Sequence, residues 1–213
     1  MELIPAAVEA FSEKYTSKES DVLYKLNRET HLKVELPHML SGHVQGQFLS
    51  MVSHMVRPRR ILELGTYTGY SAICLAAGLT PDGLLHTIDI NEELETRCLE
   101  YFREAGYADK IKMHIGKAAD IVAQLDEEYD LVFIDADKAG YVNYYDLVWE
   151  KLRPGGFMLA DNVLYHGQVL LPESEQGGQA KAMIRFCEKV LADDRAEQML
   201  LTIRDGLLLI RKK

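Results

Sequence analysis

The chain has 213 residues, of which 47% are hydrophobic and 27% are charged, which is enough apolar sequence for one compact domain with a sizeable core. Its 24 Lys and Arg residues against 33 Asp and Glu residues give a net charge of -9. This acidity argues against nucleic acid or an anionic membrane as a partner. No apolar run reaches the roughly 18 residues that a membrane span requires. We therefore expect a single domain over 1–213.

Three cysteines, Cys74, Cys98 and Cys187, lie far apart and form neither a CxxC pair nor a zinc-binding spacing. Free thiols in a reducing cytoplasm are the simplest interpretation. The N-terminal stretch is acidic and lacks the basic region of a secretion signal, so we expect a cytoplasmic protein.

The first 56 residues are predicted to be helical. Apolar residues recur at helical spacing in three runs, and Ser20 or Asp21 is a suitable N-cap for the second of them. Pro37 interrupts the pattern before the third run, which ends near Pro58. The segment 1–56 is therefore expected to form an N-terminal helical segment, with an α/β core over 57–213.

From residue 61 the periodicity changes to short strands that alternate with helices. We expect strands at 61–64, 84–90, 111–115, 129–137 and 157–161. Helices are expected between them, at roughly 70–78, from Asn91, at 118–125 and at 140–151. The strand at 129–137 contains an unbroken apolar run, which is typical of a central strand covered on both faces. The alternation predicts a parallel sheet with helices on both sides.

The C-terminal end departs from this alternation. A helix is expected at 179–192, followed by two β-rich runs at 198–204 and from Leu207 onward. Asp205-Gly206 between them is a signal for a two-residue hairpin turn. The sheet is therefore expected to end in an antiparallel pair.

A glycine loop follows the first strand, and an acidic residue ends the second. Glycines such as Gly65 let the backbone approach a ligand, and the helix start together with the Ser71 hydroxyl suits a carboxylate. Asp89 stands where a carboxylate can accept ribose hydroxyls. The pattern is ExGxxxG, and not the GxGxxG of dinucleotide sites, with Glu63 beside the loop. A carboxylate there would repel a pyrophosphate but attract the ammonium and sulfonium groups of S-adenosylmethionine (SAM). The alternative is an ordinary strand–turn–helix junction without a ligand.

Oxygen-bearing side chains end the fourth and fifth strands. Asp135, Asp161 and Asn162 would meet at the carboxyl edge of the sheet and suit a hard divalent cation. Asp137 is better explained as a cap of the following turn. Lys138, beside this group, is a candidate proton acceptor, because a nearby cation disfavours its ammonium form. A solvent-exposed lysine and helix-capping carboxylates are the alternatives.

At this point the sequence resembles the cation-dependent, SAM-dependent O-methyltransferases, the group that includes the caffeoyl-CoA and catechol O-methyltransferases. The resemblance covers nearly the whole chain. It rests on the motifs GQFL (46–49), ILELGTYTGYSA (61–72), TIDI (87–90), DLVFIDADK (130–138), LRPGGFMLADNV (152–163) and RDGLLL (204–209).

The resemblance implies a fold, a reaction and a set of site residues. The fold is the class I SAM-methyltransferase sheet, Rossmann-like, with seven strands, the last antiparallel, and helices on both faces. The reaction is transfer of a methyl group from SAM to a hydroxyl of a small aromatic vicinal diol, with Mg, Mn or Ca as the cation. The implied cation ligands are Asp135, Asp161 and Asn162, and the implied catalytic residue is Lys138. The implied SAM contacts are Met39, Ser41, Glu63, Gly65, Tyr67, Ser71, Asp89, Ala118 and Asp135. A homodimer is also expected.

One segment departs from the pattern of the group. Many relatives carry a tryptophan and then a small residue after ADNV, where this chain has Leu164, Tyr165, His166 and Gly167. Because this segment lines the acceptor site in the group, Tyr165 and His166 are expected to shape the choice of acceptor. Two other functions stay open: a nicotinamide-dependent oxidoreductase, which would need GxGxxG, and a SAM-binding regulator without turnover.

Overall fold

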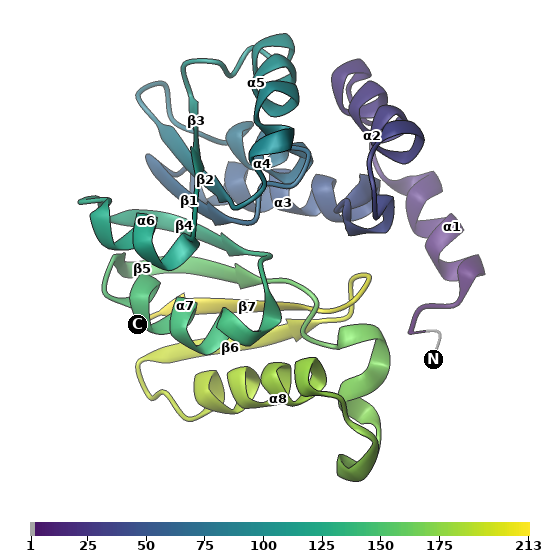
Figure 1. The fold of residues 1–213 in the computed structure, drawn as a ribbon, viewed down its shortest axis with the longest axis vertical. Helices are drawn as coiled ribbons and strands as arrows, with labels where there is room; N and C mark the ends of the chain where they lie inside the picture. Colours follow the sequence, from purple (N-terminus) through teal and green to yellow (C-terminus); the bar gives the residue numbers. More distant parts are fainter. Residues whose placement is uncertain (1–2) are drawn as a thin grey trace.

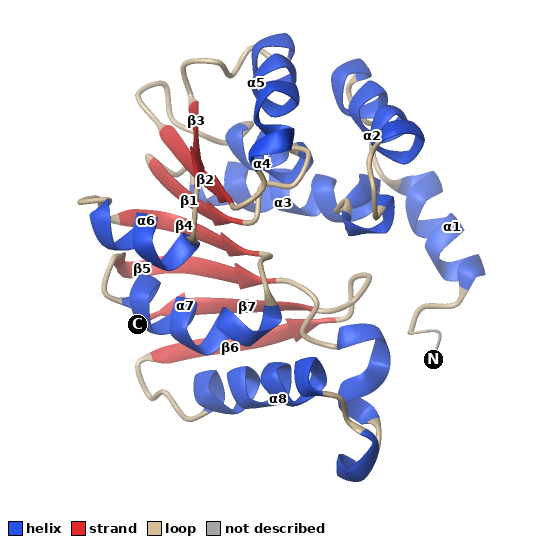
Figure 2. Cartoon of the chain, in the orientation of Figure 1, coloured by secondary structure: helices blue, strands red, loops and turns tan. Residues whose placement is uncertain are grey.

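A twisted mixed sheet forms the centre of the computed structural model, which describes residues 3–213, and its strands lie one below another from β3 to β6 in Figures 1 and 2. Within these residues its strands are β1 (Arg60–Leu64), β2 (Leu84–Asp89), β3 (Ile111–Ile115), β4 (Tyr129–Ile134), β5 (Leu152–Ala160), β6 (Ala196–Leu201) and β7 (Leu207–Lys212). Their order is β3-β2-β1-β4-β5-β7-β6, and β7 runs antiparallel to both of its neighbours. The predicted seven-stranded sheet with an antiparallel last strand is confirmed.

Helices cover the sheet on both faces, as the alternation predicted. One face carries α2 (Asp21–Lys33), α3 (Gly42–Val56), α4 (Tyr70–Ala76) and α5 (Glu95–Glu104). The other face carries α6 (Ala118–Gln124), α7 (Tyr141–Trp149) and α8 (Gly178–Leu191). Each face of the sheet therefore has its own hydrophobic core.

The central strand β4 explains why its sequence lacks alternation. Val132 and Ile134 pack into the core beneath α6, α7 and α8, while Leu131 and Phe133 pack into the core beneath α3 and α4. All four side chains are completely buried. A strand that is buried on both faces gains from an apolar residue at every position.

Several strand boundaries differ from the sequence expectation, among them both ends of β6, which spans Ala196–Leu201. Strand β4 ends at Ile134, so Asp135 to Asp137 lie beyond the sheet, and β5 begins already at Leu152. The hairpin between β6 and β7 has a five-residue connection, residues 202–206, so the predicted two-residue turn is wrong.

The turn is longer because its backbone carbonyls bond to the segment that follows β5. The carbonyls of Asp205 and Gly206 accept hydrogen bonds from Leu164 N and Val163 N instead of closing the ladder. Gly206 has φ +85°, and a Cβ there would lie 2.6 Å from Leu164 Cγ. The connection therefore packs against the segment that follows β5.

The N-terminal segment is helical, as expected. Ser20 caps α2, and its Oγ accepts a hydrogen bond from Leu23 N at 3.3 Å. Pro37 begins a short 3₁₀ helix, η1 (Pro37–Met39), between α2 and α3. Helix α1 (Ala6–Tyr15) lies at the periphery, and none of its residues is buried (Figure 1).

The remaining sequence expectations concern cysteines and membrane spans. Cys74, Cys98 and Cys187 are free thiols, two of them buried and Cys187 partly so. Across residues 3–213 no helix is both long and apolar enough to cross a membrane.

Candidate active site

A cavity of about 1270 Å³ opens at the carboxyl ends of β1, β2, β4 and β5. Open α/β sheets bind ligands at this edge. The cavity is lined by residues that the sequence predicted for the site, namely Met39, Ser41, Gly65, Tyr67, Ser71, Asp89, Ala118, Asp135, Lys138, Asp161, Asn162, Tyr165 and His166. The fold thus gathers the predicted contacts from the whole length of the chain into one space.

The glycine loop after β1 makes the cavity floor. Gly65 has φ +99°, and a Cβ there would lie 1.9 Å from the carbonyl oxygen of Asp135, so no other residue fits. Gly69, with φ +87°, is the N-cap of α4. The close approach at Gly65 brings the end of β1 against the end of β4.

Asp89 holds this loop in place. Its Oδ2 accepts hydrogen bonds from Thr66 N at 2.9 Å and Tyr67 N at 2.7 Å. Its Oδ1 accepts one from Asn91 N at 2.9 Å. A carboxylate oxygen has two acceptor sites, so Oδ1 keeps capacity for a ligand hydroxyl. Asp89 therefore shapes the loop as well as lining the cavity.

Glu63 differs from the other predicted contacts, because it lies completely buried and is absent from the cavity wall. Thr87 donates its hydroxyl to Glu63 Oε2 at 2.5 Å, while Oε1 has no hydrogen-bond partner within the described chain. Burial raises the pKa of the Glu63 carboxyl to about 8, and the carboxylates of Asp135 and Asp89 add to the rise. Hydrogen bonds from the Ser71 and Thr87 hydroxyls oppose this rise in the Glu63 pKa.

Asp161 is a second buried carboxyl, only 2% exposed. Gln45, from α3, donates its Nε2 to Asp161 Oδ2 at 2.5 Å, and Asn162 N donates to Oδ1 at 2.7 Å. Burial raises the pKa of the Asp161 carboxyl to about 7, with repulsion by Asp135 as the next cause. Nearby positive charge would relieve this repulsion.

Lys138 is held beside the carboxylates at the start of the 3₁₀ helix η3 (Lys138–Gly140). Its Nζ donates to Asp135 Oδ1 at 3.0 Å and to Tyr141 Oη at 2.8 Å. Tyr141 in turn donates to the carbonyl oxygen of Asp161 at 3.0 Å. The lysine is thus oriented by one predicted cation ligand and by a buried tyrosine.

Asp137 serves as a cap, as its sequence context indicated. It is the N-cap of η3, and its Oδ2 accepts a hydrogen bond from Gly140 N at 3.0 Å. Its other oxygen accepts from the Tyr144 hydroxyl. Both carboxylate oxygens are therefore engaged within the protein.

Tyr165 and His166 form another part of the cavity wall, and both have left-handed backbones, with φ 43° and 54°. Asp205 Oδ1 accepts from His166 N at 2.5 Å, and Asp205 Oδ2 lies 3.6 Å from His166 Nδ1. The His166 side chain is 69% exposed. The turn between β6 and β7 therefore holds this wall.

Sequence reasoning missed four residues that hold the site together: Gln45, Tyr141, Arg204 and Asp205. Gln45 and Tyr141 appear in the sequence as ordinary helix positions, and Asp205 as a turn residue. Arg204 and Asp205 belong to the RDGLLL motif (204–209), and Gln45 stands beside the GQFL motif (46–49), but neither motif indicated what these side chains contact.

The donor set of Asp135, Asp161 and Asn162 consists of hard oxygen ligands, which fit a divalent cation such as Mg²⁺ or Ca²⁺. Over residues 3–213 no group of three or more His, Cys, Asp and Glu side chains is arranged to hold a metal ion. The third donor of this set would be an amide. The buried Asp161 carboxyl, repelled by the partly exposed Asp135, is nevertheless in a position that a cation would stabilise.

The fold and this cavity define a methyltransferase-like α/β enzyme, and comparison with known proteins identifies its family. The sequence profile of the O-methyltransferase family matches residues 13–213. The chain belongs to the O-methyltransferase family. It is 35% identical to caffeoyl-CoA O-methyltransferase 2 of Zea mays over 188 residues, which are 82% of this chain and 70% of the relative.

Solved structures agree with this assignment. The SAH-bound methyltransferase PaMTH1 of Podospora anserina superimposes with a TM-score of 0.89 and 28% identity, over 97% of this chain and 94% of that chain. The O-methyltransferase TomG of Streptomyces achromogenes, in complex with SAM, gives a TM-score of 0.88 and 30% identity, over 97% and 96%. These likenesses extend over the whole α/β core.

Proposed function

We propose that this O-methyltransferase transfers the methyl group of SAM to a hydroxyl of a small aromatic vicinal diol, of the catechol or caffeoyl type, with the help of a divalent cation. The observation that carries the proposal is the meeting of Asp135, Asp161 and Lys138 in the cavity that also contains the glycine loop and Asp89.

SAM is favoured as the methyl donor by the site and by the relatives. The two structural relatives named above contain SAH and SAM. In this chain, Asp89 Oδ1, on the cavity wall beside the glycine loop, would accept a ribose hydroxyl.

A cation would be held by Asp135, Asp161 and Asn162. When bound, the cation supplies a positive charge that favours ionisation of the acceptor hydroxyl, and SAM supplies an electrophilic methyl group. Gln45 and the backbone N–H of Asn162 keep the Asp161 carboxylate oriented.

Lys138 is the group that takes the hydroxyl proton, at Nζ, a step that requires the free amine. Asp135 and Tyr141 hold Nζ in a fixed position, so that the amine faces the cavity. After proton transfer, the lysine is an ammonium whose charge is balanced by Asp135. Tyr165 and His166 on the cavity wall would orient the aromatic ring.

A methyl-transfer assay with metal-stripped protein tests the proposal. We expect transfer to catechol and caffeate in the presence of Mg²⁺ or Mn²⁺, and loss of transfer in EDTA. Full activity of metal-stripped protein in EDTA would contradict the cation requirement. SAM binding without transfer to any aromatic diol would favour the regulator, and hydride transfer with a nicotinamide would favour the oxidoreductase.

Tyr165 and His166, which we call the acceptor wall, determine the selectivity for the methyl acceptor in this proposal. Tyr165→Trp should redistribute kcat/KM among phenolic acceptors and leave SAM affinity unchanged, because the Tyr165 backbone is fixed by a bond to the Asn162 carbonyl. Loss of activity on every acceptor would instead assign Tyr165 to chemistry or to structure.

We further propose a cytoplasmic homodimer. Helix α1 exposes Val8, Phe11 and Tyr15, at 52%, 64% and 67%, which is apolar surface that a second copy could cover. The free thiols agree with a reducing compartment. Light scattering at micromolar concentration should give twice the chain mass, and a mass near 24.2 kDa would contradict the dimer.

A further inference from the structure

The segment 35–41 joins α2 to α3 and forms one wall of the cavity. We call it the strap. It contains Met39 and Ser41, two of the predicted SAM contacts. Only a single 3₁₀ turn supports it locally, and Leu36 at its start has a left-handed backbone with φ 55°. A short segment with so little local structure depends on contacts from elsewhere for its position.

Two side chains from distant parts of the chain attach the strap at its ends. At the first end, the Tyr67 hydroxyl donates to Glu35 O at 2.8 Å and Leu36 O at 3.3 Å. At the second end, Arg204 donates from Nη1 to Leu40 O at 2.7 Å and to Ser41 O, and from Nη2 to His38 O at 3.3 Å.

Arg204 donates to three backbone carbonyls of the strap, those of His38, Leu40 and Ser41. The bonds to Leu40 and Ser41 fix the chain just before α3, and a charged donor makes such bonds stronger than neutral ones. Its own backbone lies in the left-handed region, with φ 47°, where glycine is the favoured residue. An arginine at a position that favours glycine indicates that the hydrogen bonds of its side chain offset the unfavourable backbone conformation.

Asp205, which follows Arg204 in the same turn, supports the acceptor wall formed by Tyr165 and His166. Asp205 accepts hydrogen bonds from His166 N through its side chain and from Leu164 N through its carbonyl. The turn at 204–205 therefore contacts the strap on one side and the acceptor wall on the other.

We propose that Arg204 is a positioning residue that fastens the strap against the cofactor, and that Asp205 does the same for the acceptor wall, so that one turn aligns the two substrates. This inference rests on the proposed function, since it requires that the cavity bind SAM. It assigns to the β6–β7 turn a role in the reaction, although neither side chain takes part in the chemistry.

Two substitutions of Arg204 separate the side chain from the backbone. Arg204→Gly removes the guanidinium but relieves the left-handed backbone, whereas Arg204→Lys keeps a cationic donor and the unfavourable backbone. We expect calorimetry to give SAM affinity about tenfold weaker for the glycine variant, since bonds to charged groups of this kind are typically each worth about that factor. The lysine variant should remain within about threefold of the native protein.

Arg211→Ala is the matched control, because Arg211 belongs to the same hairpin but pairs with the exposed Glu197, far from the strap. It should leave SAM affinity unchanged. Native-like SAM affinity for Arg204→Gly, or weaker binding by the lysine variant than by the glycine variant, would overturn the role of Arg204.

Asp205→Ala tests the other side of the turn. We expect a higher KM for the aromatic acceptor, by about tenfold, with SAM affinity unchanged, because the His166 N–H loses its charged acceptor. An unchanged acceptor KM would overturn the role of Asp205. If the native protein itself fails to bind SAM, the proposed function fails; if it binds SAM and the Arg204 variants bind equally, only the present inference fails.

Discussion

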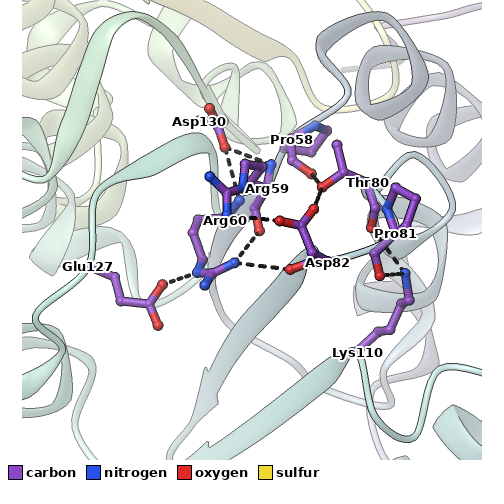
Figure 3. A network of polar contacts seen from close by, with 9 residues as sticks. All are labelled: Pro58, Arg59, Arg60, Thr80, Pro81, Asp82, Lys110, Glu127 and Asp130. Carbon is purple, nitrogen blue, oxygen red and sulfur yellow. Dashed lines mark hydrogen bonds and ion pairs between the residues drawn. The ribbon is translucent and has the colours of Figure 1, made fainter.

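The two edges of the sheet carry the same kinds of residue but organise them in opposite ways. At the amino edge of β1 and β4, a network of charges neutralises itself (Figure 3). Asp130 Oδ2 accepts from the backbone N–H groups of Arg59 and Arg60 at 2.7 and 2.9 Å, and Oδ1 accepts from Arg153 Nε at 2.5 Å. Glu127 pairs with Arg60 in the same network.

At the carboxyl edge, two carboxyls face one lysine. Asp135 pairs with Lys138, while Asp161 is buried and bonded only to neutral donors. Negative charge is therefore left uncompensated at this edge, and burial increases its cost. Charges that are paired with one another, as around Asp130, contribute to stability. Carboxyls without a charged partner, such as Asp161, cost stability and can instead bind a ligand.

The largest expected effect comes from removing a carboxylate at the carboxyl edge. Asp161→Ala should reduce methyl transfer to background, as chelation does, because a cation loses a ligand. The matched variant at the amino edge, Asp130→Ala, should keep kcat but lower the free energy of unfolding by about 1–3 kcal/mol, since the N–H groups of Arg59 and Arg60 and the Arg153 guanidinium lose a charged acceptor. Equal losses of activity in both variants would contradict the assignment of a structural role to the amino edge and of ligand binding to the carboxyl edge.

The next effect concerns the lysines. Lys138→Ala should lower kcat by ~10²–10⁴-fold, the range for loss of a general base, and leave SAM affinity nearly intact. Its pH–rate profile should also lose the inflection of a basic group. The control is Lys110→Ala at the amino edge, where Nζ donates to the carbonyls of Thr80 and Pro81. A native kcat for Lys138→Ala on every acceptor would show that ionisation of the hydroxyl needs no protein base.

A smaller effect is expected at Asp89, which serves both structure and binding. Asp89→Ala should weaken SAM binding by about 1.5–3 kcal/mol, because the ribose hydroxyls lose a charged acceptor and the glycine loop loses its hydrogen bonds. Isothermal calorimetry measures this change directly. Unchanged affinity would remove Asp89 from the site.

The smallest effect is a pH dependence of stability caused by Glu63. Its folded pKa of about 8 exceeds the ordinary 4.5, so the folded state binds more protons than the unfolded state between these values. The stability contribution of Glu63 is therefore fully present below about pH 4.5 and is lost as the pH rises through 8.

Glu63→Gln removes this titration. Relative to the ligand-free native protein, the variant should gain about 1 kcal/mol of unfolding free energy between pH 6 and pH 7, close to the limit for one proton. Denaturant unfolding at several pH values measures the difference. A difference that stays constant with pH would mean that Glu63 does not change its protonation on unfolding.

Much of this architecture could be predicted because it depends on local pattern. The apolar run in β4 follows from burial on both faces, and the five parallel strands follow from the alternation of strands with helices. The meeting of Asp135 with Asp161 follows from adjacency, since parallel strands end at one edge and β4 pairs with β5. The cap at Asp137 follows from the chemistry of a short acidic side chain at a turn.

The sequence by itself determined which elements form and which edge carries the site. Hydrophobic periodicity and the alternation of strands with helices can both be read from short stretches of chain. The tertiary structure alone decided the partners that complete the site. Gln45 reaches Asp161 across 116 residues, and Arg204 reaches Leu40 across 164. No local pattern encodes such contacts, because they depend on how two packed layers of helices and a long turn meet around the sheet. For the same reason only the folded chain shows that Glu63 is buried behind the cavity wall, where desolvation changes its charge.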